Sequence, residues 1–126
     1  MRITVYFVLF SLLPGLAYQL IQDQLRSEPM TGLAGYFLGI APNFLGGSSL
    51  AAALIVIWPE LGLGFPERRR FLIPALFALV GLWSWEGVQA FTRMTFDLHD
   101  IFWTVPGVAV ALIGALAMLP QYSKHT

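Results

Sequence analysis

The chain has 126 residues, of which 57% are apolar and only 11% are charged, and it carries no net charge at pH 7. Soluble domains have about 25% charged residues, so this composition indicates an integral membrane protein, which we expect to form one transmembrane domain over residues 1–126. A neutral chain lacks the basic surface that nucleic acid requires, which excludes nucleic acid as a partner. The absence of cysteine excludes disulfides, thiol catalysis and zinc–thiolate sites.

The first apolar segment, residues 3–22, contains no charged side chain and matches the roughly 20 residues that a helix needs to cross a membrane. We predict that it is the first of four transmembrane helices. A cleaved secretory signal is the alternative, because Gly15 and Ala17 form a small-x-small cleavage pattern after an apolar core that Arg2 precedes. Apolar character continues beyond that position, which favours a retained helix.

The second predicted helix, residues 31–58, is uncharged and longer than a straight crossing requires. At 1.5 Å per residue it would extend about 40 Å, against a hydrocarbon core of about 30 Å. Pro42 removes a backbone hydrogen bond inside it, so we predict a kink near Pro42.

Small residues recur every four positions along this helix, an arrangement that lets two helices approach closely in lipid. The stripe consists of Gly35, Gly39, Asn43, Gly47 and Ala51. Asn43 is predicted either to form an interhelical hydrogen bond within this packing face or, if the kink frees backbone carbonyls, to line a ligand pocket. The last predicted helix carries a second stripe, which consists of Gly107, Ala111 and Ala115.

The orientation follows from a loop at residues 60–70 that contains three consecutive arginines. Short loops rich in arginine stay in the cytoplasm, and Arg2 and Lys124 place both termini on the same side. The remaining helices are predicted over residues 70–91 and 99–119. We therefore expect an all-α, four-helix transmembrane bundle in the inner (cytoplasmic) membrane, with both termini cytoplasmic.

Polar side chains gather between the third and fourth predicted helices. They are Glu86, Gln89, Arg93, Asp97 and Asp100. An ionisable side chain at the bilayer centre costs roughly 2.5 to 3.5 kcal/mol, so a carboxylate beside an apolar span marks a candidate functional site. Glu86, Gln89 and Arg93 are spaced i, i+3 and i+7 and share one helical face. For Asp97 and Asp100, capping of the fourth helix is the alternative to ligand contact.

Aromatic side chains flank this polar cluster on both sides. They are Trp83, Trp85, Phe91, Phe102 and Trp103. Tryptophan and other aromatic rings gather at the level of the lipid headgroups, so we predict that this end of the bundle lies at the outer interface. Glu86 then lies about one turn inside the membrane boundary.

The polar region has a characteristic order of residues: Glu86-xx-Gln89, an arginine, Phe96-Asp97-xx-Asp100-Ile101, then Gly107 and Gly114 in an apolar helix. Over residues 83–115 this order resembles the VanZ-like family of small bacterial membrane proteins, named for a member linked to low-level teicoplanin resistance. The chain departs from the family at Thr104, where an asparagine is frequent, and at Pro106. The resemblance implies a helical membrane fold and a site more than it implies a reaction.

Three functions follow from these features. The first is a cell-envelope protein whose outward-facing cluster binds a lipid-linked or amphiphilic ligand, in relation to glycopeptide resistance. The second is a small proton-coupled transporter that forms a homodimer through the small-residue stripes, although a coupling site is expected nearer the midplane than Glu86. The third is a non-catalytic membrane assembly subunit.

Catalysis and cofactors have little support in the sequence. Carboxylates and an arginine could act as an acid/base pair, but no nucleophile or substrate is identified, so no catalytic residue is predicted. The only imidazoles are those of His99 and His125, without patterned partners, so we predict no metal site and no cofactor. Membrane lipids are the expected partners.

Overall fold

The computed structural model describes residues 1–21, 32–62, 70–91 and 98–119, with the side chains of residues 33–39, 89–90 and 98–100 also outside the description. All regular structure in these ranges is helical, which confirms the all-α prediction for them. The elements are α1 (Arg2–Phe7), the π-turn η1 (Val8–Leu12), α2 (Leu13–Leu20), α3 (Gly32–Ile57), the 3₁₀ turn η3 (Trp58–Leu61), α4 (Leu72–Phe91) and α5 (Leu98–Met118).

Four helices result, because α1, η1 and α2 continue one another as a single first helix. Three helical stretches are long and apolar enough to cross a membrane, namely Arg2–Leu20, Ile40–Leu61 and Ile101–Met118. In α4 the apolar stretch Leu72–Val88 is shorter. This length and composition agree with a membrane protein.

Much of the outward surface of the described helices is apolar. Large apolar side chains are exposed on every helix, among them Leu16, Ile57, Phe77 and Ile113. Lipid chains solvate such side chains without cost, whereas water does not. The side-chain distribution therefore suits a bilayer.

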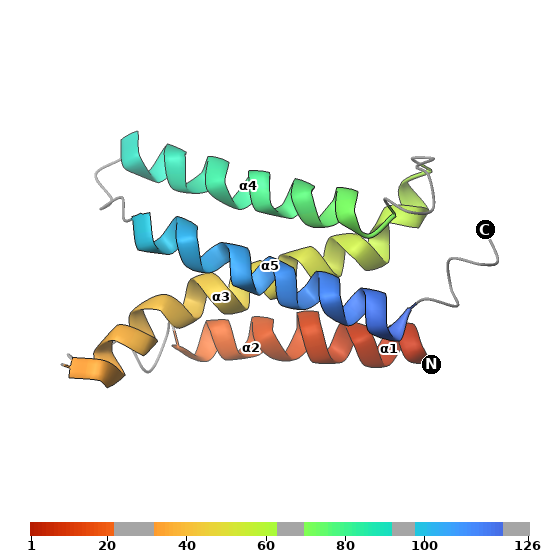
Figure 1. The fold of residues 1–126 in the computed structure, drawn as a ribbon, viewed down its shortest axis with the longest axis horizontal. Helices are drawn as coiled ribbons and strands as arrows, with labels where there is room; N and C mark the ends of the chain where they lie inside the picture. The colour runs from red at the N-terminus through yellow and green to blue at the C-terminus, as the bar shows by residue number, and fades with distance from the viewer. Residues whose placement is uncertain (22–31, 63–69, 92–97, 120–126) are drawn as a thin grey trace.

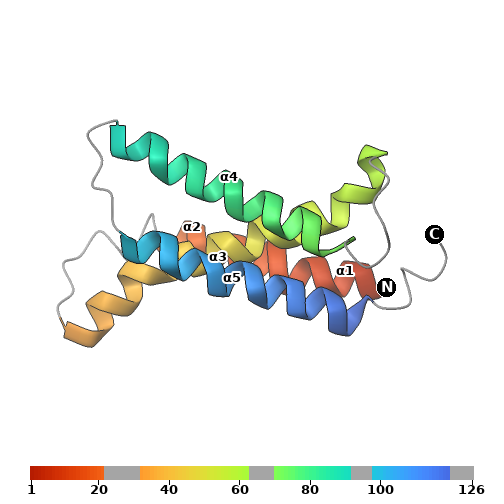
Figure 2. The ribbon, with the colours of Figure 1, turned by 45° about the horizontal axis from the view of Figure 1, so that its top comes forward.

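Helix α3 is the central element. It contacts the first helix, α4 and α5, while α4 packs mainly on α3 and α5. In Figure 1, α3 runs obliquely across the molecule, and α3 and α5 point in the same direction, opposite to the first helix and α4. Figure 2 shows from a second direction that α3 and α4 converge near η3 and diverge toward the other end of the molecule.

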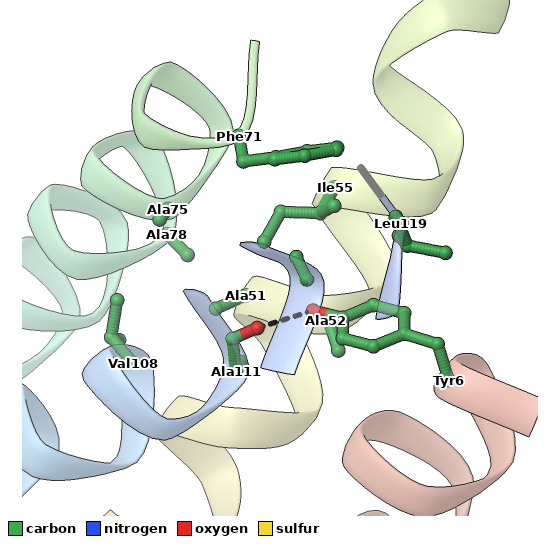
Figure 3. Close-up of a cluster of buried hydrophobic side chains, with 11 residues drawn as sticks. Tyr6, Ala51, Ala52, Ile55, Phe71, Ala75, Ala78, Val108, Ala111 and Leu119 are labelled. Carbon is green, nitrogen blue, oxygen red and sulfur yellow. Dashed lines mark hydrogen bonds between the residues drawn. The ribbon is translucent and has the colours of Figure 1, made fainter. Parts of the chain in front are cut away.

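The core consists mainly of alanines. Ala51 and Ala52 of α3, Ala75 and Ala78 of α4, and Ala111 and Ala115 of α5 are buried in one cluster with Tyr6, Ile55, Phe71, Val108 and Leu119 (Figure 3). Burial of apolar area gives little driving force between helices in lipid, so close approach through small side chains supplies the van der Waals contact instead. A core of this composition is the expected result.

The closest helix approach joins α3 and α5. A Cβ atom added to Gly47 would lie 2.8 Å from the carbonyl oxygen of Thr104, and one added to Gly107 would overlap the carbonyl group of Phe44. Any side chain at either glycine would separate the two backbones. Gly47 and Gly107 therefore form the crossing point of α3 and α5.

Within the described residues, parts of both predicted small-residue stripes are buried inside one chain. Gly47 and Ala51 of α3 are buried, as are Gly107, Ala111 and Ala115 of α5. These residues pack α3 against α5 within one chain, and the homodimer through the stripes stays a prediction. Gly35 and Gly39 lie in α3, in the part whose side chains are outside the description.

Candidate functional site

Glu86 lies near the end of α4, five residues before the helix stops at Phe91. At about 1.5 Å per residue this places it roughly 7 Å from the helix end, measured along the axis. Its side chain is half-buried, in contrast to the exposed Trp85 and Val88 on either side of it. Glu86 is thus partly covered, next to exposed side chains near the same helix end.

A hydrogen bond ties this end of α4 to α5. The indole Nε1 of Trp83 donates to the carbonyl oxygen of Ile101 across 3.3 Å. Next to that carbonyl, the rings of Phe102 and Trp103 pack edge to face, with centroids 6.0 Å apart. Because Trp83 and Glu86 are one helical turn apart, the same contact holds the Glu86 turn near the start of α5.

Most of the predicted interfacial aromatic residues lie on the surface at this end. Trp83, Trp85, Phe91 and Phe102 are exposed, and Trp103 is half-buried. Figures 1 and 2 both show the end of α4 and the start of α5 at the same end of the molecule. The helices therefore bring the two aromatic groups that flank the polar cluster to one end.

The other members of the predicted cluster are described only in part. Gln89 occupies a helical position in α4 and Asp100 one in α5, but their side chains are outside the description. Arg93 and Asp97 lie outside the described residues. Because Glu86 and Gln89 are both in α4 at a spacing of three, they share a helical face. Contact between the five polar residues stays a prediction.

Asn43 lies at a different level of the molecule. It precedes Phe44, whose carbonyl meets Gly107 at the α3–α5 crossing, and it is half-buried there. Glu86 is one turn beyond Trp83, which bonds to Ile101. From Ile101 to Gly107, the helical rise along α5 alone is on the order of 10 Å. Asn43 thus lies beside the α3–α5 crossing, and its two interpretations, a packing contact or a pocket at the kink, both stay predictions.

The predicted site does not include Tyr6, Ser11, Ser48 and Ser49, which are buried or half-buried polar residues. Each donates its hydroxyl hydrogen to a backbone carbonyl of another helix. A sequence signal existed, because Ser48 and Ser49 directly follow Gly46-Gly47 on the close-packing stretch, and hydroxyl groups often bond across helices in membranes.

The fold and the apolar surface define the class of the protein, a helical protein suited to a membrane. In the part of the chain that the structure describes, no group of three or more histidine, aspartate or glutamate side chains is placed to hold a metal ion. No protein-family model, curated protein or solved structure matches the chain.

Proposed function

We propose that this chain is a cell-envelope membrane protein that binds a lipid-linked or amphiphilic ligand at the end of the molecule where α4 stops and α5 begins. Glu86, Gln89, Arg93, Asp97 and Asp100 are the ligand-binding residues of this proposal. The VanZ-like resemblance of residues 83–115 adds a relation to glycopeptide resistance in a bacterial membrane. Asn43 serves the packing of α3 on α5.

The proposal rests on one observation: the half-buried carboxylate of Glu86 lies one turn from the Trp83–Ile101 contact, on a helix that has no other charged residue. A carboxylate in such a helix is expensive to place in a membrane and is retained where it has a use. The exposed rings of Trp85 and Phe102 offer apolar surface beside it. An amphiphile has both parts that such a surface accepts, a polar headgroup and an apolar chain.

The proposal includes a membrane topology. The described helices form a four-helix transmembrane bundle in the inner membrane, with α4 as the third span and with a kink in α3 near Pro42. The arginines of the 60–70 loop keep that loop and both termini in the cytoplasm. The end of α4 that carries Glu86 then faces the outside of the cell, where cell-wall precursors and glycopeptides meet the membrane.

The experiment compares amphiphile retention by variants of the full chain. Wild-type protein is purified in detergent, reconstituted in nanodiscs and incubated with teicoplanin as the probe; bound probe and co-purified lipids are identified by mass spectrometry. Glu86→Gln keeps the size of the side chain and removes its charge, and we expect at least a tenfold loss of bound amphiphile. Glu60→Gln is the matched control, because Glu60 is exposed in η3 at the other end of the molecule.

Equal retention by wild type and Glu86→Gln would contradict the ligand proposal. Further measurements then distinguish the transporter from the assembly subunit. A dimeric proton-coupled transporter requires uptake that depends on a proton gradient and on Glu86, whereas an assembly subunit tolerates Glu86→Gln in every assay.

A further inference from the structure

Three serine hydroxyls join the first helix to α3. Ser11 Oγ donates to the carbonyl oxygen of Ser49, and Ser49 Oγ donates back to that of Ser11, each across 2.9 Å. Ser48 Oγ donates to the carbonyl oxygen of Phe10, also across 2.9 Å. The side chains of Ser11 and Ser48 are only 5% and 2% exposed. We name this set of three bonds the serine clasp.

The first helix has a local defect at the clasp. Pro14 lacks an N–H group, so the carbonyl of Phe10, four residues earlier, has no α-helical donor. The segment Val8–Leu12 is a π-turn, in which the N–H of Leu13 bonds back to the carbonyl of Val8. A carbonyl that loses its α-helical donor is costly in lipid unless another group bonds to it. The hydroxyl of Ser48 supplies that bond.

The π-turn also changes which side chains share a face of the first helix. Tyr6 and Ser11 are five residues apart. In an α-helix five residues go about 140° beyond one turn, so the two hydroxyls would point in different directions. Tyr6 lies in α1 and Ser11 in the π-turn that follows it, and the wider π-turn rotates less per residue, which reduces that angle. Both hydroxyls can therefore reach neighbouring helices, Tyr6 to Ala111 of α5 and Ser11 to Ser49 of α3.

Gly15 makes room for the clasp. A Cβ atom at this position would lie 2.9 Å from Ser49 Oγ, which is closer than a carbon atom and a hydroxyl oxygen can pack. The absence of a side chain at Gly15 thus lets Ser49 approach the backbone of the first helix. Pro14 and Gly15 shape the same surface of the first helix. Pro14 leaves the Phe10 carbonyl without its α-helical donor, and Gly15 leaves space for Ser49 beside it.

We propose that the π-turn, Pro14, Gly15 and the serine clasp form a register lock, which docks the first helix on α3 and α5 in a single axial and rotational setting. Much of the first helix is exposed, including Leu9, Leu12 and Leu16. In lipid, the free energy of these exposed apolar side chains is the same in any axial or rotational setting of the first helix, so they do not select one. The hydroxyl-to-carbonyl bonds are directional, and they select the setting.

The docking can be measured in the full chain by thiol cross-linking, because the chain has no native cysteine. The ring of Tyr18 lies 3.7 Å from where a Cβ atom of Gly46 would be, so Tyr18→Cys with Gly46→Cys reports on the docked first helix outside the clasp. A short bifunctional thiol reagent joins the two cysteines, and intact-mass spectrometry gives the cross-linked fraction. The reaction is followed through an SDS titration, which brings the docked and undocked forms to comparable amounts.

The clasp variant is Ser11→Ala with Ser48→Ala and Ser49→Ala. An interhelical hydrogen bond in a membrane protein contributes on average about threefold to such an equilibrium, so we expect the docked-to-undocked ratio to fall roughly 20-fold at the wild-type midpoint. Ser84→Ala is the matched control, because Ser84 Oγ bonds within its own helix, to the carbonyl of Val80. If the triple variant does not fold, the single variant Ser48→Ala is measured instead, and we expect its docked-to-undocked ratio to fall about threefold.

Pro14→Ala distinguishes the register lock from a general effect on the stability of the first helix. It restores an N–H donor to the Phe10 carbonyl and raises helix propensity, so a merely structural first helix would dock more tightly. The register lock predicts the opposite: the π-turn closes, Tyr6 and Ser11 move to different faces, and cross-linking falls. The proposal would be wrong if the first helix of Pro14→Ala docked more tightly than that of the wild type. It would also be wrong if the serine variants undocked at the same SDS concentration as the wild type.

Discussion

The hydroxyl of Tyr6 donates a 2.7 Å hydrogen bond to the carbonyl oxygen of Ala111, joining the first and last helices across 105 residues of sequence. Tyr6 is fully buried, and its ring stacks on that of Phe10 with centroids 5.1 Å apart. The ring of Phe10 in turn fills the space beside Gly114. One polar contact and two rings thus attach the first helix to α5.

Tyr6→Phe removes the hydroxyl and keeps the ring. Interhelical hydrogen bonds in membrane proteins contribute about 0.6 kcal/mol on average and up to about 1.7 kcal/mol, so we expect a loss of about 1 kcal/mol in the free energy of unfolding. Tyr6→Ala also removes the stacked ring, and large-to-small changes of this size cost about 3 kcal/mol or more. Unfolding in SDS, followed by circular dichroism, measures both. Equal losses would show that the hydroxyl bond, and not the ring, holds the contact.

Gly107→Ala should destabilise the protein, because the added Cβ atom would overlap the carbonyl group of Phe44 and force α3 and α5 apart. Overpacking of this kind costs about 1 to 3 kcal/mol. Gly81→Ala is the matched control: no heavy atom lies within 4 Å of its added Cβ, and replacing a mid-helix glycine stabilises by about 0.5 to 1 kcal/mol. The two variants should therefore shift the unfolding midpoint in opposite directions, and a common direction would contradict the crossing assigned to Gly107.

The proposed orientation is tested by single cysteines in a chain that has none of its own. Ser27→Cys and Thr95→Cys should react with an impermeant thiol reagent on intact cells, whereas Gly64→Cys should react only after the cells are opened. The reason is the arginine-rich loop, which stays in the cytoplasm. The reverse pattern would move the Glu86 end of the molecule to the cytoplasm.

Glu86→Ala and Arg93→Ala should have different consequences. Glu86 is half-buried near the end of α4, so its removal is expected to lower both the yield of folded protein and amphiphile retention. Arg93, seven residues further along the chain, is proposed to meet an anionic ligand, so Arg93→Ala should reduce retention at least fivefold with little loss of folded protein. Yield in detergent is measured beside retention. Equal loss of folded protein in both would indicate one structural ion pair.

Pro42 is predicted to bend α3 by more than about 20° within one turn. The helix continues through this proline, which removes one backbone hydrogen bond. Pro42→Ala should straighten the helix and change the distance between spin labels placed at Gly32 and Ile57. An unchanged distance would show that tilt alone accommodates the long helix.

The sequence was sufficient to predict that the described part of the chain is all-α, with four helices. Backbone groups in a membrane must bond within their own segment, so hydropathy and segment length specify helices without knowledge of their neighbours. The spacing of small residues identified Gly47, Ala51, Gly107, Ala111 and Ala115 as packing positions. Glu86 stood out because a charge interrupts an apolar span, and its placement at the end of α4 needed only the helix itself.

Tertiary structure alone decided which helices these residues join. The stripes of α3 and α5 meet each other within one chain, at Gly47 and Gly107, and Tyr6 reaches Ala111 from the far end of the sequence. The reciprocal bonds of Ser11 and Ser49 form where the first helix contains a π-turn. Helix formation depends on hydrogen bonds between residues that are close in sequence, so it can be predicted from the sequence. Helix pairing in lipid depends on the rotation and depth of each helix, which directional contacts between distant residues select.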